Sequence, residues 1–294
     1  MTKHSGISVV VATDGSRPAA AAIKTALTFP WPEGTRMTGV VARRTFATSG
    51  RPGYVMAAYD RHWADVAARA RRALRARFPG VEVHVVDDSP ADAILAEAKR
   101  RDADITVVGW RGHGTFRRLF MGSVSREVVR RASSAVLVVR RAPRAVRRLV
   151  IGVDGSPNAA RAVALVARLV PPRGAQVAVV GVMEPMTLPS LAILPAAVRG
   201  PLRREAAAIE KTQAAKLKRE LDGAVERLGA AGWKARATIR RGAPLRELLA
   251  VVDASDADLL VLGARGTGGV ERLLLGSVAE GALARARVPV LVTP

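Results

Sequence analysis

The feature that most constrains the fold of this 294-residue chain is an internal repeat. The segment ISVVVATDGS at residues 7–16 returns as LVIGVDGS at residues 149–156. A second segment, DITVVG at residues 104–109, returns as DLLVLG at residues 258–263. Segments that recur in the same order along the chain mark tandem copies of one structural unit. A chain of this length also exceeds what one hydrophobic core usually holds. We therefore expect two similar domains.

The boundary is predicted in the segment RRAPRAVRR at residues 140–148, which contains a proline and five arginines. A polar, proline-containing segment of this kind is typical of a short solvated linker. We accordingly expect a first domain at residues 1–141 and a second at residues 147–294.

Within each half, short β-branched runs alternate with helical stretches. The expected strands of the first half lie at residues 7–13, 37–42, 81–86, 105–109 and 136–139. Most are nearly continuous apolar runs, as in strands that are buried on both faces. The run at 81–86 instead alternates with Glu82 and His84, which favours a strand near a sheet edge. Alternating strands and helices predict an α/β fold with a parallel sheet and right-handed crossovers.

The spacing of glycines is the motif that carries chemistry. The pattern G-x2-G-x9-G-S follows the fourth expected strand of each half, at residues 109–123 and 263–277. Glycines after a strand let a ligand approach the backbone N–H groups closely. A Gly-Ser pair that opens the next helix adds a hydroxyl and the positive end of the helix dipole, which favour phosphate. Residues 277–280 also fit a helix capping box, so Ser277 has a structural reading beside the phosphate one.

Other phosphate and nucleophile motifs do not fit. A Walker sequence needs a lysine after its glycines, and a dinucleotide fingerprint needs its glycines after the first strand. The pattern Gly-x-Ser-x-Gly of a nucleophile elbow does not occur in the sequence.

The Asp-Gly-Ser turn after strand one, the glycine loop after strand four and the valine-rich last strand together resemble the universal stress protein family, in two tandem copies. The resemblance implies a five-stranded parallel sheet in the order 3-2-1-4-5 in each domain, flanked by helices. In that order the carboxyl ends of strands one and four border a crevice, where open α/β sheets bind ligands.

By the same resemblance, each domain would bind ATP, with Mg²⁺ held through the phosphates. Asp14 and Asp154 would lie near adenine and ribose, and Val41 and Val182 would offer backbone groups to the adenine edge. Val108 and Leu262 would pack on the nucleotide. The phosphates would be lined by Gly109, Gly112, Gly122 and Ser123 in the first domain and by Gly263, Gly266, Gly276 and Ser277 in the second. Two structural readings stay open: Asp14 as a turn residue that bonds its own backbone, and Val108 and Leu262 as core residues.

In this family the last strands pair between domains. We expect residues 136–139 and 290–293 to do so here, because their apolar edges would otherwise be exposed. The chain would then form an intrachain pseudo-dimer, and a homodimer of whole chains stays open.

The charge of the chain suggests an alternative. Lys and Arg number 47 against 25 Asp and Glu, a formal net charge of +22. A strongly basic protein can bind nucleic acid or another polyanion. The arginines are scattered, however, and aromatics make up only 4% of the chain, too few for a base-stacking platform. Any binding of nucleic acid should therefore be non-specific.

The expected function is an ATP-binding regulatory protein of the stress response, with one nucleotide site per domain. A slow ATP-hydrolysing enzyme is a further alternative, but no catalytic set can be assigned from the sequence. Since the chain has no cysteine, it also has no disulfide framework or thiolate metal site. No sequence run is long and apolar enough for a membrane span. These features favour the cytoplasm.

Overall fold

The computed structural model of the chain describes residues 6–44, 53–112, 121–185, 196–266 and 275–294. The first half contains β1 (Ser8–Ala12), α1 (Arg17–Thr28), β2 (Arg36–Arg43), α2 (Gly53–Arg75), β3 (Glu82–Asp87), α3 (Pro90–Arg100), β4 (Ile105–Gly109), α4 (Ser123–Arg131) and β5 (Ala135–Val139). The second half contains β6 (Arg148–Gly152), α5 (Pro157–Ala167), β7 (Gln176–Met183), α6 (Ala196–Ala230), β8 (Lys234–Arg241), α7 (Pro244–Ala254), β9 (Leu259–Gly263), α8 (Ser277–Arg285) and β10 (Val290–Thr293).

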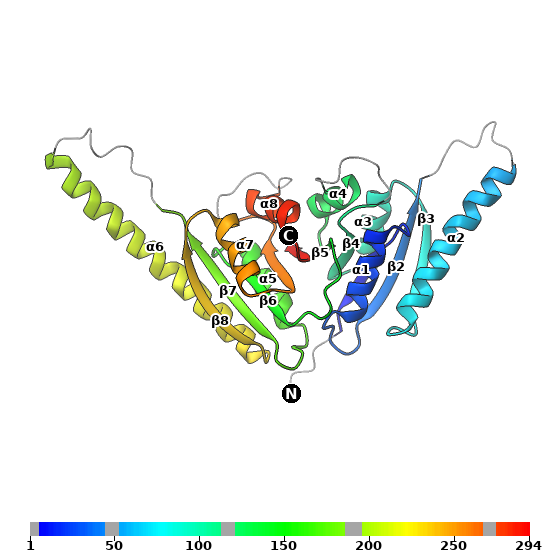
Figure 1. Ribbon diagram of the computed structural model, residues 1–294, viewed down its shortest axis with the longest axis horizontal. Coiled ribbons are helices and arrows are strands. Elements are labelled where there is room, and N and C mark those ends of the chain that lie inside the picture. The colour runs from blue at the N-terminus through cyan, green and yellow to red at the C-terminus, as the bar shows by residue number, and fades with distance from the viewer. Residues whose placement is uncertain (1–5, 45–52, 113–120, 186–195, 267–274) are drawn as a thin grey trace.

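The strands form one ten-stranded sheet in the order β3-β2-β1-β4-β5-β10-β9-β6-β7-β8. Each half therefore has the predicted order 3-2-1-4-5, and all its strands are parallel. The predicted pairing between the two last strands is also present, because β10 runs antiparallel to β5 with Leu291 opposite Leu137. Two five-stranded sheets thus become one. Figure 1 shows the halves spreading from this junction, with α2 and α6 on the outer flanks.

Alternation along β1 divides the core into two layers. Val9 and Val11 face one layer, which also contains Ala22 of α1 and Leu74 of α2. Val10 faces the other layer, with Ile94 of α3 and residues of α4. Each layer includes residues of both halves, so the hydrophobic core continues across the β5–β10 junction.

The N-termini of α5 and α8 are capped differently. Ser156 is the N-cap of α5, its hydroxyl accepts from the Ala159 N–H at 3.2 Å, and Pro157 is the first helical residue. The capping box at residues 277–280 is wrong. Gly276 holds the N-cap position of α8 and Ser277 is already inside the helix, so its side chain is not a cap.

Candidate functional site

The Asp-Gly-Ser turn after the first strand has the same geometry in both halves. Gly15 and Gly155 have φ values of +78° and +79°, a region that favours glycine. Oδ1 of Asp14 accepts a hydrogen bond from the Ser16 N–H at 2.9 Å, and Asp154 accepts from Ser156 at the same distance. Asp14 is therefore a turn residue that bonds its own backbone, which was one of its two expected roles. The hydrogen bond of the turn uses Oδ1 of the carboxylate.

The second oxygen of each aspartate lies against the glycine loop of the neighbouring strand. A Cβ atom added to Gly112 would overlap Oδ2 of Asp14, and one added to Gly266 would overlap Oδ2 of Asp154. β1 pairs with β4, and β6 with β9, so each contact joins the ends of two adjacent strands. The order of the strands thus brings the predicted aspartates and glycines together at the carboxyl ends of the strands.

The first glycine of each loop has a packing role. A Cβ atom on Gly109 would lie 2.7 Å from the carbonyl carbon of Pro18, at the start of α1. One on Gly263 would lie 2.8 Å from Cβ of Asn158 in α5. These glycines allow a helix to pack directly on the end of a strand. The need for glycine here therefore comes from the fold, although both residues also border the cavities described below.

The last glycine of each loop forms a hydrogen bond with the residue that directly follows the preceding strand. The Gly122 N–H donates to the Trp110 carbonyl at 2.9 Å, and the Gly276 N–H donates to the Ala264 carbonyl at 2.8 Å. Gly122 and Gly276 are the N-caps of α4 and α8, with no side-chain capping bond. The first-turn N–H groups of these helices therefore have no partner from an N-cap side chain. The middle of each loop, residues 113–120 and 267–274, lies outside the described residues.

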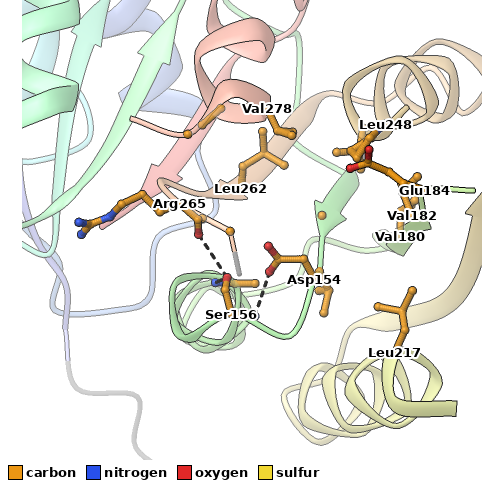
Figure 2. Close-up of a pocket in the computed structure, with 18 of the residues that line it drawn as sticks. Asp154, Ser156, Val180, Val182, Glu184, Leu217, Leu248, Leu262, Arg265 and Val278 are labelled. Atoms are coloured by element: carbon orange, nitrogen blue, oxygen red, sulfur yellow. Dashed lines mark hydrogen bonds between the residues drawn. The ribbon is translucent and has the colours of Figure 1, made fainter. Parts of the chain in front are cut away.

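In each half, a cavity lies at the carboxyl ends of these strands. The first-half cavity has a volume of about 830 Å³ and the second-half cavity about 1080 Å³. Thirteen of the predicted site residues line them. Those in the first half are Asp14, Val108, Gly109, Gly112, Gly122 and Ser123, and those in the second half are Asp154, Val182, Leu262, Gly263, Gly266, Gly276 and Ser277. Figure 2 shows Asp154 beside Ser156, with Leu262, Val180 and Val182 among the surrounding side chains.

Val41 does not line the first cavity, whereas its neighbours Val40 and Ala42 do. Val41 is fully buried in a cluster that includes Val66 of α2, on the other face of the sheet. The sheet registers make Val40 equivalent to Val180, so the counterpart of Val182 is Ala42. A shift of one residue along a strand changes the face of the sheet, and this shift separates Val41 from the residues predicted beside it.

Several residues that line each cavity were not predicted from the sequence. The first cavity is also lined by Arg44, Tyr59, Trp63 and Arg126, and the second by Glu184, Gln213, Lys216, Leu217 and Glu220. Most of these residues come from α2 and α6. The alternation of strands with helical stretches predicted helices here, but it did not indicate which of their residues would face a cavity at the end of the sheet.

Ion pairs brace the rim of the first cavity. Arg43 at the end of β2 pairs with Asp87 of β3 and with Asp60 of α2. The hydrogen bond from Arg43 lowers the pKa of Asp87 below its ordinary value. These pairs connect α2 to the two outer strands next to the cavity-lining residues Arg44 and Tyr59. In the part of the chain that the structure describes, no cluster of three or more His, Asp or Glu side chains could hold a metal ion by itself.

The geometry of the two sites agrees with a comparison of the chain with known protein families. The family model described as "Universal stress protein family" matches twice, over residues 8–140 and 145–294. The chain belongs to the universal stress protein family. None of the helices among the described residues is both long and apolar enough to cross a membrane.

Several curated relatives come from mycobacteria. Universal stress protein Rv2005c of Mycobacterium tuberculosis is 30% identical over 211 residues, which cover 65% of this chain and 62% of the relative. The matched region thus spans less than two thirds of that relative. A universal stress protein of Mycolicibacterium smegmatis is 30% identical over 217 residues, covering 72% of this chain and 68% of the relative.

Solved structures show the same fold over the whole chain. A universal stress protein of Archaeoglobus fulgidus superposes with a TM-score of 0.64 at 19% identity, covering 100% of this chain and 99% of that one. The functionally unknown protein PA1789 of Pseudomonas aeruginosa gives a TM-score of 0.61 at 14% identity, over 99% of this chain and 93% of that one. At these identities the likeness concerns the fold alone.

Proposed function

We propose that the chain is a regulatory protein of the stress response that binds one adenine nucleotide in each of two domains, residues 1–141 and 147–294. The observation that carries this proposal is repeated in both halves. An aspartate from strand one meets a glycine of the loop after strand four, at the mouth of a cavity that also borders a glycine-capped helix N-terminus. The same arrangement in two copies is hard to attribute to local turn chemistry.

The cavities suit a nucleotide in size and in the distribution of polar groups. Pockets for small molecules are commonly about 300–1000 Å³ and mostly apolar, with a few polar groups that orient the ligand. Here Val40, Val108 and Ile94 supply apolar surface to the first cavity. Gly122 and Ser123, at the N-terminus of α4, also line this cavity, and backbone N–H groups and the helix dipole favour phosphate there. The base would therefore lie against the apolar residues and the phosphates against the helix N-terminus.

The ligand proposed for both cavities is ATP. Mg²⁺ would accompany it through the phosphate oxygens, because the described lining residues do not form a metal centre of their own. Bound Mg²⁺ supplies neutralisation of the phosphate charge. The protein residues proposed to hold the nucleotide are the aspartate, the glycines and the serine of each site. We also propose a cytoplasmic location, as the cysteine-free composition favours.

Titration calorimetry of nucleotide-stripped protein tests the proposal. We expect a stoichiometry near two for ATP with Mg²⁺. A Cβ atom at Gly122 would lie 3.2 Å from Cα of Arg111, and one at Gly276 would lie 3.2 Å from the Ala264 carbonyl oxygen. Gly122→Val and Gly276→Val should therefore distort one loop each and remove one site each. Gly80→Val is a matched control, because a side chain at Gly80 meets open space.

The double variant Gly122→Val/Gly276→Val should bind no ATP, whereas Gly80→Val should keep both sites. Thermal melting provides a second measurement. A ligand present at about 100 times its dissociation constant stabilises the folded state by about 2.7 kcal/mol per site. Absence of binding to the unmodified chain at millimolar ATP with Mg²⁺ would refute the nucleotide proposal.

A further inference from the structure

Equivalent positions in the two cavities carry side chains of different charge. The sheet registers place Arg44, just after β2, at the position that Glu184 occupies just after β7. The two helices can be aligned as well. A Cβ atom on Gly15 would meet Val66 of α2, and one on Gly155 would meet Glu220 of α6. Val66 of α2 therefore corresponds to Glu220 of α6, and the other positions of the two helices correspond at the same separation along the chain.

The described lining of the first cavity is basic. Arg44, Arg111 and Arg126 line it, and Asp14 is its only carboxylate among the described residues. The described lining of the second cavity is acidic instead: it contains the carboxylates of Asp154, Glu184 and Glu220 against Lys216 and Arg265. Asp14 is equivalent to Asp154, and Arg111 to Arg265, so the difference arises entirely at the other positions.

The uncharged lining residues that come from α2 and α6 also differ between the two cavities. Tyr59 and Trp63 line the first cavity with their rings edge to face, 6.0 Å between centroids. Their counterparts by the helix alignment are Gln213 and Leu217, which line the second cavity. The cavities thus share their aspartate and glycines, and they differ in lining residues from the β2 end, α2 and α4 in the first half and from the β7 end and α6 in the second.

We propose that the two sites select nucleotides of different charge. The first-domain cavity binds the free, fully ionised nucleoside polyphosphate more tightly than its Mg²⁺ complex, which still occupies both sites at saturating concentration. The second-domain cavity takes a nucleotide of reduced charge, either with fewer phosphates or with its phosphates neutralised by Mg²⁺. This inference rests on the proposed function, because it concerns the same two sites. It goes beyond that function by assigning a different ligand form to each.

The size of the effect follows from Coulomb's law. In water, one pair of unit charges about 10 Å apart changes an equilibrium constant by about twofold before screening by salt. ATP carries several charges, and the two linings differ by several charges of the lining side chains. At low ionic strength we therefore expect the ratio of the AMP to the ATP dissociation constant, measured without Mg²⁺, to be about tenfold larger at the first site than at the second.

Calorimetric titrations on the full chain test this with one site blocked at a time. Gly276→Val leaves the first site to be measured, and Gly122→Val leaves the second. Each variant is titrated with ATP and with AMP, in EDTA and again in excess Mg²⁺. We expect the first site to bind ATP more tightly in EDTA than in Mg²⁺, with an affinity that falls steeply with added salt. We expect the second site to bind ATP more tightly with Mg²⁺ than without.

Charge reversal at the equivalent rim positions provides the matched test, and it does not depend on the glycine variants folding. Arg44 and Glu184 are both exposed, so Arg44→Glu and Glu184→Arg should leave the unfolding temperature unchanged. Each substitution changes the lining charge by two units, so Arg44→Glu should lower the affinity of the first site for ATP in EDTA by about tenfold, and Glu184→Arg should raise that of the second site by a similar factor. Arg36→Glu, exposed at the opposite end of β2, is the control and should change neither.

The outcomes separate this inference from the proposed function. Two sites with equal AMP-to-ATP ratios and equal responses to Mg²⁺ would overturn the inference and leave the proposed function intact. The inference is equally overturned if only one site binds any of these nucleotides. If neither site binds, the proposed function fails, and the inference fails with it.

Discussion

The indole N–H of Trp110 donates a hydrogen bond to the backbone carbonyl of Leu283 at 2.8 Å, across the junction between the two halves. Trp110 directly follows Gly109 of the first glycine loop, and Leu283 lies in the last turn of α8. Arg140 stacks on the same indole with its guanidinium carbon 3.8 Å from the ring centroid, and it donates to the Ala284 carbonyl at 2.7 Å. Residues of the first half thus satisfy carbonyls at the C-terminus of α8, where a cation is also favourable.

We expect this contact to contribute to the stability of the whole chain. Trp110→Phe keeps most of the buried ring but leaves the Leu283 carbonyl without its donor, which should cost about 1–2 kcal/mol. Trp110→Ala also creates a cavity and should cost about 3–5 kcal/mol. Urea unfolding followed by circular dichroism measures both. Equal stability of Trp110→Phe and the unmodified chain would show that the hydrogen bond contributes nothing at the junction.

Replacing a second tryptophan, Trp63, should instead raise the stability of the protein. The Nε1 atom of Trp63 is buried and has no hydrogen-bond partner among the described residues. A buried unsatisfied donor costs roughly 1–3 kcal/mol. Trp63→Phe removes that donor and keeps an aromatic ring, so we expect the nucleotide-free protein to become more stable by about 1 kcal/mol.

The control for Trp63 is Trp233→Phe. The Trp233 Nε1 atom is also buried but donates to the Val166 carbonyl at 3.2 Å, so this substitution should destabilise the chain. Both variants are compared by their urea midpoints at unchanged slope. Destabilisation of similar size in both would argue that the partner of the indole N–H does not decide the outcome.

Glu97 should make stability depend on acid pH. Its side chain is only 2% exposed and pairs with Arg100 and, at 3.0 Å, with Arg101. Burial acts to raise the pKa of Glu97, but hydrogen bonds from both arginines outweigh it, and the pKa is lowered overall. A carboxylate with a depressed folded-state pKa stabilises the fold above its ordinary pKa, about 4.5, and this contribution is lost as the pH falls below that value.

Glu97→Gln should therefore destabilise the protein by about 2 kcal/mol at pH 7, and the difference from the unmodified chain should shrink below pH 4.5. Melting temperatures from pH 3 to 8 measure this effect. Glu127→Gln is the control, because Glu127 and its partner Arg131 are both about half exposed, and such pairs contribute little. A Glu97→Gln defect that stays constant down to pH 3 would contradict the role of ionised Glu97.

The strand order, and with it the meeting of Asp14 with Gly112, could be predicted because the turn and loop motifs resemble those of a known family, and that resemblance implied the order in which the strands lie. Glycine spacing identifies a loop, and alternating apolar runs identify strands. The face on which Val41 lies could not be predicted in the same way, since β2 is apolar on both faces and its register depends on neighbouring strands. The charge difference between the cavities was also missed, because Arg44 and Glu184 resemble ordinary surface residues until the fold places them at equivalent rims.

The two halves of the chain join at β5, which pairs with β10. Val136, Leu137 and Val138 are fully or almost fully buried and pair with residues 290–292 of β10. Expression of residues 1–141 alone would leave this apolar strand as an open sheet edge, which readily pairs with another chain.

The antiparallel β5–β10 pairing is centred on Leu137 opposite Leu291, so two copies of β5 can pair in the same way with Leu137 at the centre. We therefore expect the 1–141 fragment to dimerise or aggregate in sedimentation equilibrium at micromolar concentrations. Addition of an equal amount of the 147–294 fragment should convert the self-associated species into a one-to-one complex, because β10 restores the native partner of β5 and α8 restores the contacts of Trp110 and Arg140. A 1–141 fragment that stays monomeric, or that ignores the second fragment, would show that the buried β5 edge does not drive association.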